Sequence, residues 1–110
     1  MSKRILLPLL GLALATALFS AGIAGAATKT VTLKNIAFSP KTLKVSKGAT
    51  VTFAFRDGTT VHNVTSTGAK HFKSIGNRSS GSKSRTFASA GTYRYQCTLH
   101  PGMTGRIVVR

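Results

Sequence analysis

Apolar and polar residues alternate with a period of two along much of the chain after residue 26. In the first such segment, Val31, Leu33 and Ile36 are the expected buried positions. A period of two predicts half-buried β-strands, and the Thr, Val and Phe content of these segments agrees. Strands are expected at residues 31–36, 43–45, 51–55, 61–65, 83–87, 92–97 and 105–110.

Turn signals separate these segments. Pro40, Gly48, Gly58 and Gly91 stand between successive apolar runs, and no part of this region offers ten residues of helical spacing. Residues 66–82 are rich in Gly and Ser and predict a long connection with at most one short, irregular strand. Short strands at such intervals predict an all-β fold, a Greek-key β-sandwich of about seven to eight short strands.

The first 26 residues have a different composition. Lys3 and Arg4 precede an apolar run from Ile5 to Phe19, and small residues follow up to Ala26. This order is typical of a secretory signal peptide. We therefore expect residues 1–26 to be cleaved and residues 27–110 to form one domain outside the cytoplasm, in the periplasm or at the cell exterior. An uncleaved N-terminal anchor is the alternative.

The charge is strongly one-sided. The chain has 16 Lys and Arg residues and one acid, Asp57, so its formal net charge is +15. Such a balance indicates an anionic partner, either an acidic protein face or an anionic membrane or envelope surface, and a basic surface that is only solvated is the alternative. Nucleic acid is not expected, because an export signal is present and no nucleic-acid-binding motif is recognisable. With a single acid, hydrolysis by paired carboxylates is also not expected.

The C-terminal region holds the candidate chemistry. Cys97, His100 and Met103 follow one another at intervals of three residues, and His62 lies in an earlier predicted strand. One thiolate, two imidazoles and one thioether are the donors of a type 1 (blue) copper site that transfers electrons. Zinc is the competing metal, but thioethers are not among its usual ligands. His71 has no such neighbours and is expected to be a surface residue.

The chain resembles the cupredoxins over essentially all of residues 27–110, and most of all the plastocyanin and amicyanin group. The matching segments are His62-Asn63-Val64, Phe72-Lys73-Ser74, residues 91–103 from Gly91 to Met103, and residues 105–109. The short interval between His100 and Met103 is similar to that of amicyanin.

The resemblance implies one type 1 copper ion held by His62, Cys97 and His100, with Met103 as a long axial ligand. It also implies that Asn63 connects its strand to the ligand loop through Thr98. His100 would be the exit for electrons, and Leu99, Pro101 and Gly102 would form a small apolar docking patch around it.

Two departures from the family pattern matter. Val61 stands where relatives often have proline before the first histidine, and the basic charge contrasts with the acidic plastocyanins. The basic charge leads us to expect redox partners with an acidic docking face. From the ligand set we expect a monomeric one-electron carrier and not an enzyme. A copper-sequestering or copper-delivery protein, or a metal-free cationic surface protein, are the alternatives.

Overall fold

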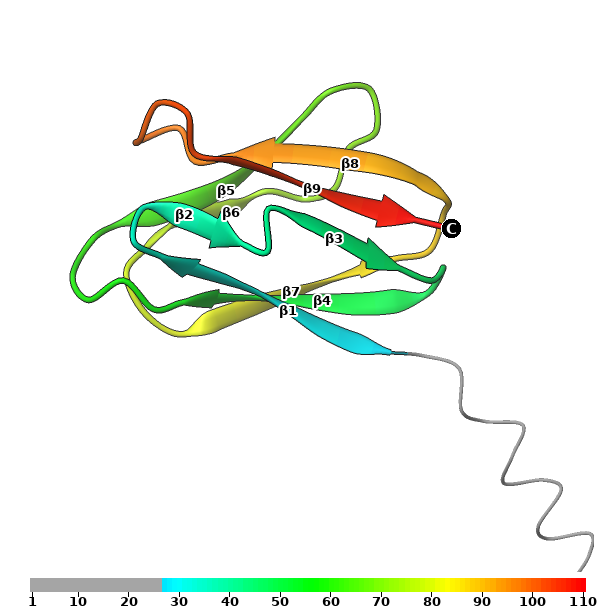
Figure 1. Ribbon diagram of the computed structural model, residues 1–110, viewed down its shortest axis with the longest axis horizontal. Coiled ribbons are helices and arrows are strands. Elements are labelled where there is room, and N and C mark those ends of the chain that lie inside the picture. Colours follow the sequence, from blue (N-terminus) through cyan, green and yellow to red (C-terminus); the bar gives the residue numbers. More distant parts are fainter. Residues whose placement is uncertain (1–26) are drawn as a thin grey trace, which may run out of the picture.

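The computed structural model describes residues 27–110 as a sandwich of two β-sheets (Figure 1). No residue of this range is helical, and so none of it forms a helix long and apolar enough to cross a membrane. The predicted all-β sandwich is confirmed, whereas the predicted signal peptide lies outside the described residues. The strands are β1 (Thr28–Lys34), β2 (Ala37–Ser39), β3 (Thr42–Val45), β4 (Ala49–Phe55), β5 (His62–Thr67), β6 (Ile75–Arg78), β7 (Ser82–Phe87), β8 (Gly91–Gln96) and β9 (Thr104–Val109).

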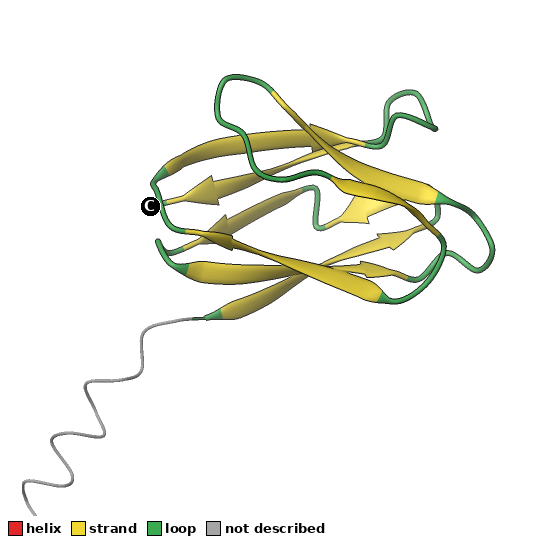
Figure 2. Ribbon diagram, turned by 180° about the vertical axis from the view of Figure 1, so that it is seen from behind, coloured by secondary structure: helices red, strands yellow, loops and turns green. Residues whose placement is uncertain are grey.

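The two layers have a mixed strand pairing. One sheet has the order β2-β1-β4-β7 and the other the order β3-β9-β8-β5-β6. β1 runs parallel to β4 and β3 runs parallel to β9, while the remaining pairs are antiparallel. The chain changes sheet after β2, β3, β4, β6 and β7, so most connections cross the ends of the sandwich (Figure 2).

The number of strands exceeds the predicted seven to eight because two short strands are added. β6 is the short strand anticipated in the 66–82 connection. β2 arises because the segment around Ile36 is a hairpin turn and not the end of a strand. Asn35 and Ile36 have φ values of 54° and 52°, and Ile36 is 52% exposed, so its predicted burial is wrong. A two-residue loop between antiparallel strands often needs positive φ at both positions, and this requirement overrides the alternating pattern.

Aromatic side chains fill the space between the sheets. Tyr95 of β8 packs edge-to-face on Phe53 of β4, with ring centroids 5.4 Å apart. Phe72, from the long connection, stacks on Phe53 at 6.1 Å and meets Phe87 at 5.3 Å. Such pairs add about 0.5–1.5 kcal/mol each beyond the area that they bury. They anchor the β5–β6 connection and hold the two sheets in a fixed relation.

One end of the sandwich gathers the segments that carry the candidate ligands. β5 and β8 are antiparallel, with Thr65 opposite Gln96, so the start of β5 lies beside the end of β8. The 56–61 loop, the β1–β2 turn and the 97–103 loop therefore meet at this end, on the left in Figure 1.

Candidate metal centre

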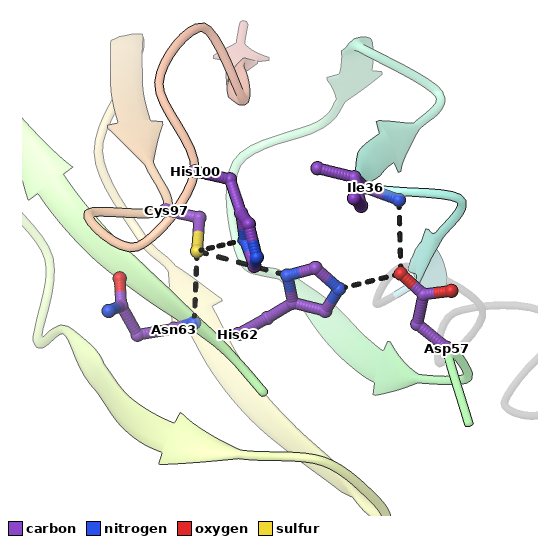
Figure 3. A network of polar contacts seen from close by, with 6 residues as sticks. All are labelled: Ile36, Asp57, His62, Asn63, Cys97 and His100. Atoms are coloured by element: carbon purple, nitrogen blue, oxygen red, sulfur yellow. Dashed lines mark hydrogen bonds and ion pairs between the residues drawn. The ribbon is translucent and has the colours of Figure 1, made fainter. Parts of the chain in front are cut away.

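Three of the predicted ligands converge on one point. The Sγ atom of Cys97 lies 3.5 Å from Nδ1 of His100 and 3.8 Å from Nδ1 of His62, as Figure 3 shows. The three donor atoms all lie within 4.8 Å of one another. His62 and Cys97 are buried, and His100 is partly exposed. The site is therefore closed on the protein side and reaches solvent through His100.

The loop after β8 folds back on itself. The N–H of Cys97 donates to the carbonyl of Met103 at 2.9 Å, and the N–H of Met103 donates to the carbonyl of His100 at 3.1 Å. Gly102 adopts a φ of 83°, which the tight turn requires. These bonds bring the two ends of the loop together. Met103, the last residue of the loop, is buried, with 4% of its surface exposed.

Asn63 connects β5 to this loop by three hydrogen bonds. Its backbone N–H points at Sγ of Cys97 at 3.5 Å. Its side-chain amide donates to Oγ1 of Thr98 at 2.7 Å and accepts from the Thr98 N–H at 3.0 Å. Thr65 and Asn77 complete the hydrogen bonding of the same amide. The expected contact between Asn63 and Thr98 is thus present, and it fixes the loop against the strand that begins with His62.

Asp57 is the residue that the sequence reasoning missed. Its Oδ2 atom lies 2.8 Å from Nε2 of His62 and accepts the backbone N–H of Ile36 at 3.0 Å. These two hydrogen bonds, the Ile36 one foremost, hold the pKa of the Asp57 carboxyl below its usual range. With the proton of His62 on Nε2, the lone pair of Nδ1 faces Cys97. The signal available in the sequence was a lone acid in a basic chain, five residues before the histidine.

The other sequence positions fall outside the cluster. His71 is exposed in the connection between β5 and β6, where the sequence placed it. Val61 is 41% exposed beside His62. Leu99 is 44% exposed beside His100.

The donor set fits copper. Nitrogen and thiolate ligands lie about 2.0–2.3 Å from a bound transition metal, so two donors of one ion are separated by roughly 3.5 Å. The two Sγ–Nδ1 distances of 3.5 and 3.8 Å agree with this separation. Two imidazoles, a thiolate and a nearby methionine are the ligand types of type 1 copper.

Comparison with known proteins agrees with this chemistry. The sequence profile of cupredoxin-like domains matches residues 7–109. The chain belongs to the cupredoxin-like domain family. Copper is the cofactor that fits both this family and the cluster of His62, Cys97 and His100 with the neighbouring Met103. No curated protein matches the sequence.

Several solved cupredoxins share the fold. A reduced Cu(I) form of an amicyanin variant at pH 4 is 31% identical, with a TM-score of 0.67 over 76% of this chain and 82% of its own. A pseudoazurin from Sinorhizobium is 27% identical, with a TM-score of 0.62 over 76% of this chain and 74% of its own. A purple cupredoxin from Nitrosopumilus maritimus is 22% identical, with a TM-score of 0.67 over 74% of this chain and 99% of its own, a likeness of fold alone.

Proposed function

We propose that the protein carries single electrons through one type 1 copper ion, which His62, Cys97 and His100 would hold, with the Met103 thioether as a fourth, weaker donor. The observation that supports this most directly is the convergence of one Sγ and two Nδ1 atoms within 4.8 Å at one end of the sandwich. Bound copper supplies a Cu(II)/Cu(I) couple.

The surrounding residues restrict movement of the donors. His62 is fully buried, and Asp57 holds its ring from the far side. Asn63 holds the Cys97 loop through Thr98. Ligands that keep their places require little rearrangement when the charge of the site changes, which suits rapid electron transfer. Such outer contacts also fix the orientation and tautomer of a metal-binding histidine.

The exposed surface at this end is the proposed contact for redox partners. Among residues 27–110, the exposed large hydrophobic side chains are Ile36, Val61 and Leu99. Val61 and Leu99 directly precede the two histidines, and the N–H of Ile36 is bonded to Asp57. Together with Pro101 and Gly102 they form an apolar patch around His100, the proposed exit for electrons.

The remaining features of the proposal rest on the sequence. Residues 1–26 have the composition of a signal peptide, which supports the proposal that they are cleaved and that the domain lies in the periplasm or at the cell exterior. The positive charge favours partners with an acidic docking face, and an anionic membrane or envelope surface is a further candidate. We propose a monomer that does not act as an enzyme and does not bind nucleic acid.

Spectroscopy and voltammetry test the proposal together. The Cu(II)-loaded protein should show an intense visible band from thiolate-to-copper charge transfer, and it should cycle reversibly at an electrode. Cys97→Ser should abolish the band, and His71→Ala, which changes a histidine outside the cluster, should keep it. A colourless copper complex would exclude the type 1 site. A coloured complex that does not cycle reversibly would favour copper sequestration or delivery instead.

A further inference from the structure

The outer face of the five-stranded sheet has a hollow of about 520 Å³. It crosses β3, β9, β8 and β5, because Thr42 pairs with Arg106, Arg106 with Arg94, and Arg94 with Thr67. Lys41 also lines it. Lys41, Arg94 and Arg106 are exposed, so three positive charges border one depression that three threonines also line.

This arrangement opposes the stability of the sheet. Arg94 and Arg106 stand directly opposite each other on β8 and β9, and like charges in such pairs are destabilising. No acidic side chain offsets them, because Asp57 is the only acid of the chain and its Oδ2 bonds to His62 and Ile36. The requirements of the fold do not explain the pair, whereas a bound anion would offset the repulsion.

Neighbouring groups already orient the basic side chains. The guanidinium of Arg106 donates through Nε to Oγ1 of Thr42 at 3.1 Å. A Cβ atom on Gly68 would lie 3.8 Å from Cβ and Cδ of Arg94, so the stem of Arg94 runs along the glycine backbone. Ordering these long side chains in advance lowers the entropy lost when a partner binds.

The hollow is also connected to the metal centre. Gln96 and Thr104 line it, and they directly precede Cys97 and follow Met103 in the chain. Gln96 and Thr104 are paired across β8 and β9. A molecule seated in the hollow would therefore lie beside the two strands that hold both ends of the ligand loop.

We propose that this hollow is a second docking surface, in addition to the apolar patch around His100, and that it receives the acidic face of a protein redox partner. That the partner is redox-active rests on the function proposed above. That it presents carboxylates rests on the positive charges of Lys41, Arg94 and Arg106. A depression admits protruding Asp and Glu side chains, whereas a planar lipid surface would contact only its rim. Docking here would be electrostatic and would weaken as salt is added.

Binding of fluorescein-labelled poly-L-glutamate to the copper-loaded protein tests the proposal by fluorescence anisotropy. One variant combines Lys41→Gln, Arg94→Gln and Arg106→Gln. Its control combines Lys29→Gln, Lys47→Gln and Lys83→Gln, which removes the same charge from exposed positions away from the hollow. The hollow variant should weaken binding about tenfold and the control by less than about threefold.

Other results of the same binding experiment would contradict the docking surface or change its ligand. Equal weakening in both variants would show that only net charge matters and would overturn the proposal. Competition by inorganic phosphate as strong as that of the polymer would indicate a small-anion site instead. Stronger and hollow-dependent binding to phosphatidylglycerol vesicles would indicate a membrane surface instead. A protein that binds the polymer at the hollow but lacks the visible band would contradict the electron-carrier function and still support the docking surface.

Discussion

The carboxylate of Asp57 accepts a hydrogen bond from the Nε2–H of His62 across 2.8 Å. The histidine is fully buried and the side chain of the acid is 16% exposed. Because the same carboxylate oxygen accepts the Ile36 N–H, one residue joins the β1–β2 turn to a ligand of the proposed metal site. The single acid of a strongly basic chain thus orients the imidazole whose Nδ1 faces Cys97.

Replacing Asp57 should weaken copper binding. Asp57→Asn removes the charge that favours the Nε2–H tautomer of His62, and loss of such a partner typically costs about 10–100-fold in metal affinity. We expect a loss near the lower limit, because the amide oxygen can still accept the hydrogen bond. Chelator competition measures the affinity, and Thr59→Ala in the same loop is the control. Unchanged affinity and an unchanged visible spectrum would show that Asp57 does not position His62.

The Asn63 contacts should contribute to the stability of the metal-free protein. Asn63→Ala leaves the Thr98 backbone N–H and hydroxyl without their partners, and we expect a loss of about 2–4 kcal/mol in the free energy of unfolding. Thr98→Val should cost less, about 1 kcal/mol. Urea unfolding of both single variants and the double variant measures the coupling between them. Simple additivity would mean that the two side chains do not act as a unit.

The β1–β2 turn should become more stable with glycine at position 36. Ile36 has a φ of 52°, which is unfavourable for a β-branched residue, and it is largely exposed. Ile36→Gly should raise the free energy of unfolding by about 0.5–1 kcal/mol, after allowing for the added freedom of glycine in the unfolded chain. Ile36→Ala should give less, since alanine keeps a Cβ atom. Equal gains from both variants would attribute the effect to the apolar side chain and not to the backbone.

Tyr95 should make the protein sensitive to alkali. Its buried hydroxyl has no hydrogen-bond partner among the described residues, and burial raises the pKa of Tyr95 well above its usual value of 10.0. Above that usual value the unfolded chain loses the proton while the folded protein keeps it. The unfolded state then binds fewer protons, so stability falls as pH rises.

The variant Tyr95→Phe should therefore lose less stability than the parent between about pH 10 and pH 11. At neutral pH it should be as stable as the parent or slightly more stable, because an unpartnered hydroxyl is removed. Tyr93→Phe is the matched control, since the Tyr93 hydroxyl donates to the carbonyl of Ser89 at 2.8 Å. That control should cost about 1 kcal/mol at neutral pH. An identical alkaline profile for Tyr95→Phe and its parent would contradict the argument.

The thioether of Met103 should tune the potential of the metal site. Met103→Leu keeps the volume of this buried side chain and should cost less than about 1.5 kcal/mol of stability. It removes a thioether that would donate to the oxidised metal, so the reduction potential should rise. Voltammetry of the copper-loaded protein measures the shift. An unchanged potential would show that Met103 is not a ligand of the metal.

Much of this architecture is readable from the order of residues. Alternation identifies the strands around Phe53 and Tyr95, because each of these strands has one face packed in the core and the other directed to solvent. The segment from Cys97 to Met103 is readable because its geometry is local and its turn needs Gly102. Alternation fails at Ile36, where the pairing of β1 with β2 sets the backbone conformation.

The chain order was sufficient for the alternating strands, for the ligand types and for the local loop. The strands and the loop depend on neighbours within a few positions, and the ligand types are the side chains themselves. Tertiary structure decided which distant side chains meet. The register of β5 against β8 brings His62 to Cys97, and the β1–β2 turn brings Ile36 to Asp57. Cross-strand register likewise places Arg94 beside Arg106. These relations depend on how strands pair in space, which alternation along one strand does not encode.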